Sequence, residues 1–523
     1  MKFMKVALVI AVALCLAGTV YAETQSVKVS GDLTVRGIFR DHYDYLSAAG
    51  NHEPPQTAGT GSAVTTTRTG NTRTNQEWIM SVAEIQVDAD LTDNVQTVIR
   101  LVNQRDWNVY SKSTTSGYIS GPNGTGGYQY DDQAFNVMLD LAYVTLKDFI
   151  YSPLTVTIGR QDLWFGKGFI VGANMQNPGM NGMTGAPNQI APASASNMST
   201  IGNLSAPEYT AITGFDSIKA VLDYDPWTIT AIYANINTGA IQDTDSTNLW
   251  GVNVGYKFDA YKAEMEGYWF WKQDNMIDAY AALKDQSNEV QTFGLRGSFD
   301  PIDVITIAAE GAYQGGTYVG SSLQHNNCGR SAWAIDASVE ARMFTDKYSW
   351  KPKLGAEFIW YSGEAERNDA GAAGTYNGWD PMYRGKFDSA IREFVGRFYR
   401  TGKYGEVPTQ LVTSPDASFT NQYQVIFLGS IQPMESLNIK ANYNLFWNQA
   451  LYDVTDSKSK GYVGSEIDIN ATWDYTEDVS FGLLAGFFVP GTVYDTTPSD
   501  GTMYNSAGNQ IATDIVGSVK VSF

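Results

Sequence analysis

The sequence predicts an all-β fold: a transmembrane antiparallel up-and-down β-barrel of about 18 strands, with short periplasmic turns and long extracellular loops. Three observations carry this prediction. Short segments alternate apolar and polar residues, which places every second side chain on one face of a strand. The connections alternate between tight turns, such as Asp225-Pro226 and Asp300-Pro301, and long stretches rich in Gly, Asn, Ser and Thr. The last segment ends the chain on an aromatic residue, Phe523.

The predicted strands follow one another along almost the whole chain. The first, residues 27–40, has apolar residues such as Leu33 at odd positions and polar residues such as Arg36 at even positions. Strands of about 10 to 14 residues are long enough, because about 9–11 residues cross the apolar layer of a membrane. The predicted strands lie near residues 27–40, 77–92, 94–106, 134–148, 153–164, 215–225, 227–236, 248–258, 261–272, 290–299, 302–314, 331–344, 350–361, 420–432, 437–448, 462–475, 478–490 and 511–523.

Tryptophan residues lie near the ends of several predicted strands. Transmembrane barrels carry aromatic girdles at the two membrane interfaces. We therefore expect these residues to belong to such girdles: Trp78, Trp227, Trp269, Trp350, Trp360 and Trp473.

The two ends of the chain carry targeting signals. Lys2 and Lys5 precede a short apolar run, and Val20-Tyr21-Ala22 offers small residues for cleavage, which predicts a secretory signal peptide over residues 1–22. Residues 23–523 are expected to form a single outer-membrane β-barrel domain, since no linker or change of composition divides them. The alternation that ends at Phe523 resembles the C-terminal assembly signal of outer-membrane barrels. We therefore expect outer-membrane lipid and the barrel-assembly machinery as partners.

Composition excludes several classes of protein. The mean hydropathy is −0.23, and no apolar run after the signal is long enough for a membrane-spanning helix. The formal net charge is −20 and no block of Lys and Arg occurs, so nucleic acid is not an expected partner. After the signal the only cysteine is Cys328, which we expect to be a tolerated loop residue without a disulfide or metal partner. No cofactor and no metal site are expected.

Two short motifs resemble a known family. The segment 158–166, Ile-Gly-Arg-Gln-Asp-Leu-Trp-Phe-Gly, resembles the Gly-Arg-Gln-x-Leu-x-x-Gly signature of outer-membrane porins of the alginate export family. The segment 379–383, Trp-Asp-Pro-Met-Tyr, resembles that family's aromatic-Asp-Pro-aliphatic-Tyr loop motif. The resemblance implies an 18-stranded barrel and the passage of polysaccharides or small solutes. The motif residues are Gly159, Arg160, Gln161, Leu163 and Gly166.

The position of Arg160 in this motif admits two interpretations. Arg160 shares its parity with apolar residues of the same strand that are expected to face lipid. Either Gly159 marks a β-bulge that turns Arg160 inward, or Arg160 lies at the outer rim.

The polar strand faces predict an aqueous lumen, because a barrel of this size encloses water rather than a filled core. These faces lean acidic, which predicts a preference for cations; the alternative is that the charges pair across the wall and only keep the lumen wet. Tyr268 and Phe270, near Glu264 and Glu266, are the expected aromatic platform for a saccharide. The candidate pore-lining residues are Arg36, Arg40, Glu84, Asp88, Arg100, Glu264, Glu266, Tyr268, Arg296, Glu310, Glu340, Arg342 and Glu357.

Two long loops have distinctive sequences. No charged residue occurs between Lys167 and Glu208, so the loop 165–214 can pack inside the lumen without burying an unpaired charge. The alternative is a surface loop. In the loop 362–420, apolar residues at helical spacing from Ile391 to Phe398, with Arg392 opposite, predict an amphipathic helix. This helix is expected to cap the barrel mouth or to pack against neighbouring loops.

These features predict an outer-membrane porin, or channel, for the passive passage of small hydrophilic solutes or saccharides. One alternative is an exporter of a polyuronate such as alginate. Another is an outer-membrane barrel enzyme, or a barrel that sheathes a partner protein. The sequence offers three histidines, all in predicted loops, and no Gly-x-Ser-x-Gly motif, so no catalytic residue is proposed and no enzyme activity is expected. The solute, the direction of transport and the choice between monomer and trimer do not follow from the sequence.

Overall fold

The computed structural model describes the barrel wall almost completely. Its wall strands are β1 (Ser26–Asp41), β2 (Asn75–Thr92), β3 (Val95–Asp106), β6 (Met138–Leu146), β7 (Leu154–Gln161), β8 (Phe215–Tyr224), β9 (Trp227–Thr238), β10 (Ser246–Phe258), β11 (Ala263–Asp274), β12 (Asn288–Ile302), β13 (Ile305–Tyr318), β14 (Cys328–Arg342), β15 (Lys353–Tyr361), β17 (Gln422–Met434), β18 (Leu437–Asn448), β21 (Tyr462–Asp474), β22 (Val479–Pro490) and β23 (Ala512–Ser522). The shorter elements are β4 (Tyr110–Ser111), β5 (Gln129–Tyr130), β16 (Thr375–Tyr376), β19 (Asp453–Val454), β20 (Ser457–Lys458), the 3-10 helix η3 (Pro207–Tyr209) and α2 (Arg392–Phe394). The described residues are 26–42, 75–107, 110–111, 129–130, 137–174, 206–238, 246–259, 262–275, 287–318, 328–343, 348–364, 374–394, 419–450, 453–454, 457–458, 461–492 and 510–523.

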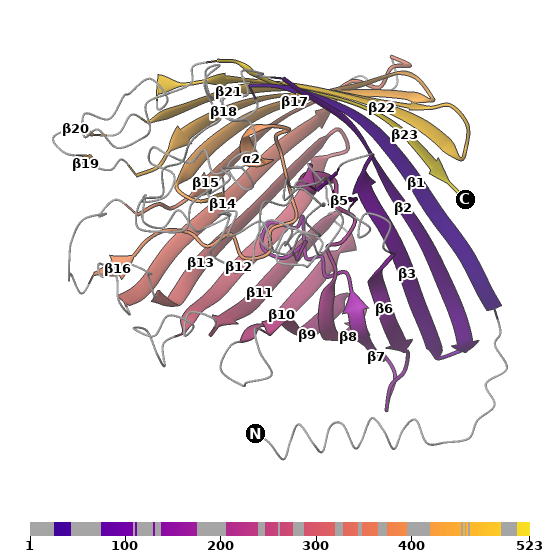
Figure 1. Ribbon diagram of the computed structural model, residues 1–523. Helices are drawn as coiled ribbons and strands as arrows, with labels where there is room; N and C mark the ends of the chain where they lie inside the picture. The colour runs from indigo at the N-terminus through magenta and orange to yellow at the C-terminus, as the bar shows by residue number, and fades with distance from the viewer. Residues whose placement is uncertain are drawn as a thin grey trace, which may run out of the picture.

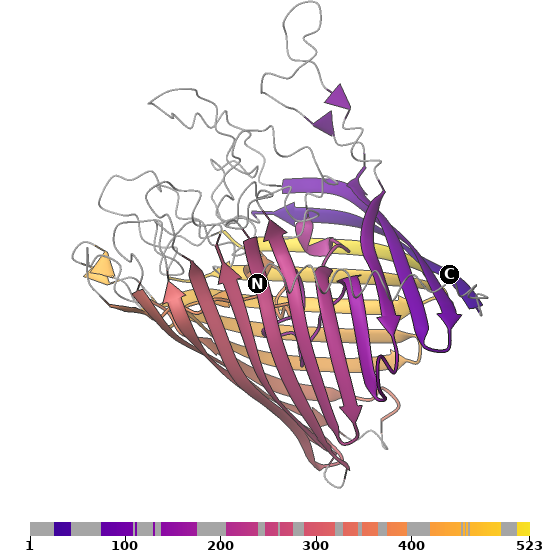
Figure 2. The same ribbon diagram turned by 90° about the horizontal axis from the view of Figure 1, so that it is seen from below.

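The wall strands close into a ring. Each pairs antiparallel with the wall strand before it and the one after it, and β23 returns to pair with β1, where Gly37 lies opposite Gly517. Figure 1 and Figure 2 show the closed, tilted barrel from two sides. The predicted fold class is confirmed, and every predicted strand overlaps a strand of the wall. The predicted signal peptide lies outside the described residues.

The two faces of the wall differ in polarity. On β12, Leu295 is 53% exposed while its neighbour Arg296 is 9% exposed. On β21, Ile467 is 46% exposed and Asp468 is 5% exposed. Because the exposed apolar side chains lie on the outside of the ring, this face suits the apolar interior of a membrane. Among the described residues, no helix is both long enough and apolar enough to span a membrane.

Aromatic residues cluster on the outer face near the tight turns. Trp227 contacts Tyr256, with ring centroids 4.6 Å apart, and Trp473 stacks on Phe481 at 5.6 Å. Trp78 departs from the predicted girdle. It pairs in register with the buried Ile38 and lies under the guanidinium of Arg40, 5.2 Å from the ring centroid, so it faces inward. Trp78 lies opposite Ile38, which is two residues from Arg40 on β1, so all three side chains are on the inner face.

Three segments between wall strands fold into the barrel. We call them the Trp164 segment (residues 162–174), the Glu208 segment (residues 206–214) and the Lys386 segment (residues 374–394). The Trp164 and Lys386 segments pair with each other: the Tyr383 carbonyl accepts the Gly172 amide at 2.8 Å, and the Tyr383 amide donates to the Ile170 carbonyl at 2.9 Å. Figure 1 shows α2 of the Lys386 segment within the ring of strands. The prediction of an inward loop over 165–214 holds for residues 165–174 and 206–214; residues 175–205 lie outside the described part.

Two local predictions have different outcomes. The helix expected from Ile391 onward is present over Arg392–Phe394, and the rest of its expected length lies outside the described residues. Arg392 is 1% exposed instead of lying on a polar outer face, because the segment folds inward and its amides bond to the wall. Cys328 was expected in a loop but begins β14, where it is buried with its Sγ 3.9 Å from the Tyr318 carbonyl.

Candidate functional site

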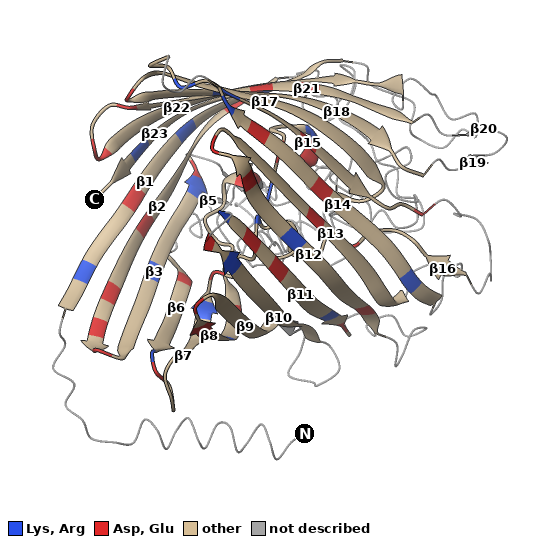
Figure 3. Ribbon diagram, turned by 180° about the vertical axis from the view of Figure 1, so that it is seen from behind, with Lys and Arg blue, Asp and Glu red and all other residues tan. Residues whose placement is uncertain are grey.

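The inner face of β11, β12 and β13 carries a charged cluster of predicted residues. Nη2 of Arg296 lies 2.6 Å from Oε1 of Glu264, and its Nη1 lies 2.5 Å from Oε1 of Glu266. The hydroxyl of Tyr268 donates to Oε1 of Glu310 at 2.7 Å. One guanidinium therefore serves two carboxylates, and the third carboxylate has a neutral hydroxyl as its hydrogen-bond donor. Figure 3 shows the acidic and basic positions along these strands.

Lys386 connects the Lys386 segment to the next part of the wall. Its Nζ lies 2.9 Å from Oδ2 of Asp336 on β14, forms an ion pair with Glu357 on β15, and lies 3.4 Å from Oδ2 of Asp388. Burial favours the neutral amine, but the three carboxylates outweigh it and raise the pKa of Lys386 above its ordinary value. The lysine is therefore charged, and it joins two strands to an inner segment.

Asp380 makes a second attachment of the Lys386 segment. Its Oδ2 lies 2.9 Å from Nζ of Lys272 on β11. Gln314 on β13 bonds the Asp380 backbone twice, donating to the carbonyl at 2.6 Å and accepting the amide at 2.9 Å. Burial would raise the pKa of Asp380, but the charges of Lys272 and Arg330 lower it below its ordinary value. The loop motif 379–383 thus lies against the wall.

A further part of the wall, β21, holds the same segment through backbone amides. The carboxylate of Glu466 on β21 accepts the Ile391 amide at 2.7 Å and the Arg392 amide at 2.8 Å. Asp468 accepts the Ala390 amide at 3.3 Å. Burial and the neighbouring Asp388 raise the pKa of Glu393 to about 7. Wall carboxylates of β14, β15 and β21 therefore hold the Lys386 segment inside the barrel.

Arg40 and Arg36 of β1 contact the Glu208 segment. Nε of Arg40 lies 3.1 Å from Oδ1 of Asp514 on β23, and its Nη2 forms an ion pair with Glu208. The guanidinium of Arg36 lies 4.6 Å from the ring centroid of Tyr209. Burial raises the pKa of Glu208, and Arg40 opposes this shift. All these groups are inside the ring.

The remaining predicted residues also have close partners. Nη2 of Arg100 lies 2.5 Å from Oδ2 of Asp140, and its Nε lies 3.7 Å from Oε2 of Glu84. Asp88 accepts a hydrogen bond from Gln86 at 3.0 Å. On the inner face of β14, Arg342 lies 3.6 Å from Glu340. The structure thus gathers most of the predicted charges into pairs and small networks, as one of the two sequence interpretations expected.

The Gly-Arg-Gln motif forms the transition from β7 to the Trp164 segment. Gly159 has a φ of +126°, and a Cβ there would lie 2.2 Å from the Ala142 carbonyl, so only glycine fits. Neither pairing of β7 shifts register at Gly159. The bulge interpretation is therefore wrong: Arg160 stays opposite Asp216 near the strand end, with Nη1 3.3 Å from Oδ2 of that exposed carboxylate.

The later motif residues lie inside the barrel. Gln161 is buried and donates to the carbonyls of Thr157 and Ser217, both at 3.2 Å. Leu163 is buried in the core between the inner segments and the wall. A Cβ on Gly166 would lie 2.8 Å from Cδ of Arg296, so the missing side chain lets the backbone approach the charged cluster. The motif therefore directs the chain from the end of β7 into the lumen, towards the charged cluster on β11–β13.

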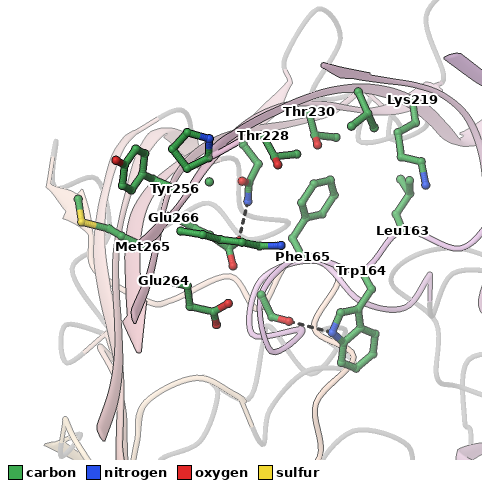
Figure 4. Close-up of a pocket in the computed structure, with 16 residues that line it drawn as sticks. Leu163, Trp164, Phe165, Lys219, Thr228, Thr230, Tyr256, Glu264, Met265 and Glu266 are labelled. Atoms are coloured by element: carbon green, nitrogen blue, oxygen red, sulfur yellow. Dashed lines mark hydrogen bonds between the residues drawn. The ribbon is translucent and has the colours of Figure 1, made fainter. Parts of the chain in front are cut away.

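The expected aromatic platform on β11 is covered. Phe270 is 0% exposed and Tyr268 is 9% exposed, because Phe165 of the Trp164 segment packs on Phe270 with ring centroids 5.1 Å apart. A pocket of about 400 Å³ lies beside this contact, between the Trp164 segment and β8–β11. Figure 4 shows Trp164, Lys219, Thr228 and Thr230 around it.

Sequence reasoning missed several residues that join the inner segments to the wall. Lys272 has the same parity as Glu264 and Glu266 on β11, and Asp514 lies on the polar face of β23. Applying the alternation of inward and outward residues along the whole of each strand therefore identifies both. Lys386 and Glu208 lie in irregular segments, where no periodicity marks the inward direction. The residues whose contacts with the wall the sequence did not indicate are Glu208, Lys272, Arg330, Asp380, Arg384, Lys386, Arg392 and Asp514.

Comparisons with known proteins agree with this geometry. The family model "Alginate export" matches residues 62–507. Among solved structures, OccK9 (OpdG) of Pseudomonas aeruginosa aligns with a TM-score of 0.50 and 10% identity, over 95% of this chain and 98% of that one. OccAB1 of Acinetobacter baumannii aligns with a TM-score of 0.48 and 10% identity, over 96% and 99%. No curated protein sequence matches the chain.

The family match covers well over half of the chain. The closed ring of 18 antiparallel strands has an apolar outer face, and its structural similarity to OccK9 shows the same fold. The apolar face belongs in the bacterial outer membrane. The protein is thus a member of the alginate export family with the fold of an outer-membrane porin.

Proposed function

We propose that this barrel is a porin through which small hydrophilic solutes, saccharides among them, cross the outer membrane passively. The observation that carries the proposal is the two-faced closed wall, apolar outside and lined inside by hydrogen-bonded charges of both signs. Such a lumen offers water and fixed dipoles to a polar solute. The three inner segments narrow the path, so the passage is selective rather than a wide opening. The channel needs no catalytic residue, and we propose none.

The experiment that tests this function is single-channel recording of the folded protein in planar bilayers. We expect discrete, stable conductance steps. Protein that is folded by circular dichroism and inserted in the bilayer, yet gives no conductance, contradicts the proposal.

The family match favours a second candidate, export of a polyuronate such as alginate. A polyanion passes most readily through a constriction lined by positive charges. On β11–β13 two carboxylates share one guanidinium and a third is bonded only to a hydroxyl, so the wall described here favours neutral solutes and cations. The ion selectivity of the channel separates the two candidates.

We also propose that the barrel-assembly machinery recognises the end of β23. Phe523 is 67% exposed, and its backbone exchanges two hydrogen bonds of 2.9 Å with Gly31 of β1. The terminal residue therefore lies at the seam where the barrel closes. Deleting Phe523 should lower the amount of folded barrel in the outer-membrane fraction, and an unchanged amount contradicts this part of the proposal.

A further inference from the structure

Trp164 has the features of a fixed, open aromatic platform. Its side chain is 55% exposed although it lies inside the ring of strands. Its ring packs against three glycines: a Cβ on Gly168, Gly172 or Gly385 would lie 2.5, 3.0 or 2.7 Å from ring atoms. The indole nitrogen donates to the Gly166 carbonyl at 3.1 Å. The close glycine contacts and the hydrogen bond hold the ring in one orientation, and about half of the side-chain surface stays open.

The pocket beside this ring carries polar groups of the kind that bind hydroxyls. Thr228 and Thr230 of β9 and Asn253 of β10 line it together with Trp164. Asn253 donates to Glu266 at 3.0 Å, which fixes its amide. In Figure 4 the two threonines and Lys219 lie along one side of the pocket, with Phe165 of the Trp164 segment in front of them. A volume of about 400 Å³ lies within the range of small-molecule sites.

The charges of the pocket decide the class of ligand. Lys219 and Lys257 line it, and Lys219 forms no ion pair or hydrogen bond within the described part of the chain. An ammonium group disfavours a second cation on the same aromatic ring, although tryptophan faces attract cations elsewhere. Glu264 and Glu266 also line it, and both pair with Arg296. A neutral ring with hydroxyls at its edges and C–H groups on its face satisfies all these groups at once.

We propose that Trp164, with Thr228, Thr230 and Asn253, forms a binding subsite for a neutral hexose ring in the path of the solute. The inference rests on the proposed porin function and names its solute class. The sugar stacks on the open face of Trp164, and its hydroxyls bond to the threonines and the amide. The subsite belongs to an inner segment rather than to the β11 wall, because that segment covers Phe270 and Tyr268.

The test uses the full barrel in planar bilayers with glucose and maltose as probes. We expect brief closures whose frequency rises with sugar concentration. Mannitol, which has no ring, should block far less. Trp164→Leu should weaken the block roughly 3- to 10-fold, the range that aromatic stacking supplies, and Trp164→Phe should restore part of it. Trp250→Leu, which removes a tryptophan that is 42% exposed on the outer face, should leave it unchanged.

Two further variants test the geometry. Gly172→Ala adds a methyl group 3.0 Å from Cε3 of Trp164 and keeps the indole, so it should also weaken the block by tilting the ring. Thr230→Val removes one hydroxyl at constant shape and should weaken it less than Trp164→Leu does. Variants count only if their conductance without sugar stays within the wild-type range.

The outcomes separate the subsite from the porin function. Channels that conduct but show no sugar-dependent closures, or closures that are unchanged in Trp164→Leu, overturn the subsite and leave the porin intact. Block by choline with the same dependence on Trp164, without block by glucose, makes the site a cation site and overturns it too. If no channel forms, titration calorimetry of maltose into the folded, detergent-solubilised protein still decides: heat that is lost in Trp164→Leu supports the subsite, and no heat contradicts it.

Discussion

At the scale of single residues, the interior of this barrel is organised by charges that have partners. Lys386 illustrates the principle, because its ammonium lies among Asp336, Glu357 and Asp388 on two wall strands and its own segment. A buried ion pair contributes little net stability when both partners are present, but removing one partner leaves the other uncompensated. Such residues therefore fix where an inner segment lies rather than how stable the barrel is.

We predict that Lys386→Gln destabilises the folded barrel by about 3 kcal/mol or more, the cost of an uncompensated buried charge. The measurement is urea-induced unfolding in lipid vesicles. Lys262→Gln is the matched control, since Lys262 pairs with Asp303 at 2.7 Å in a pair that is 66% and 88% exposed. An exposed pair is worth about 0–1 kcal/mol. Equal effects of the two substitutions contradict the role assigned to Lys386.

At the scale of elements, two irregular segments from different parts of the chain form a single inner structure. The Trp164 segment supplies Phe169 and Val171, the Lys386 segment supplies Trp379 and Tyr383, and all four side chains are buried together. Backbone hydrogen bonds between Tyr383 and residues 170–173 register the two segments. An inner structure of this kind is a resistance in series with the rest of the lumen.

We predict that replacing residues 376–393 by a short Gly-Ser linker increases single-channel conductance at least about twofold, since a narrow passage in series limits flow. Replacing residues 112–128, which belong to a long loop predicted to be extracellular, by the same linker is the control and should change conductance little. If the two replacements have equal effects, residues 374–394 do not form the constriction.

At the scale of the whole molecule, the charge of the lumen sets the selectivity. The chain carries 55 acidic and 35 basic residues, and the described inner wall repeats this excess on β11–β13, where Glu264 and Glu266 pair with Arg296 and Glu310 is bonded to Tyr268. A fixed negative charge attracts small cations and repels anions over a distance comparable with the Debye length, about 10 Å at 0.1 M salt.

We therefore predict that reversal potentials in a KCl gradient show a preference for cations. Raising the salt concentration should reduce this preference through screening. Glu264→Gln together with Glu266→Gln should reduce it further, because Arg296 then keeps its charge without two carboxylates. Clear selectivity for anions in the wild-type channel contradicts the prediction and favours the polyuronate exporter.

The sequence by itself determined the wall of the barrel. Strand number, approximate boundaries and the inner or outer direction of residues such as Leu295 and Arg296 follow from the period of two, since membrane and water act on alternate side chains of every strand. The same parity identified Arg40, Arg100 and Glu357 as inward candidates before their partners were known. Trp78 obeys the same parity, which it shares with the inward candidate Glu84, and only its place near a strand end suggested the girdle.

Only the tertiary structure decided what fills the barrel. Irregular segments have no period, so nothing local shows that Lys386 reaches Asp336 and Glu357 or that Phe165 covers Phe270. These contacts join an irregular segment to strands that lie 29 to 105 positions away in the chain, and they form only when the ring of strands encloses the segment. The position of Trp164 has the same origin, because three glycines from two segments must meet around its ring.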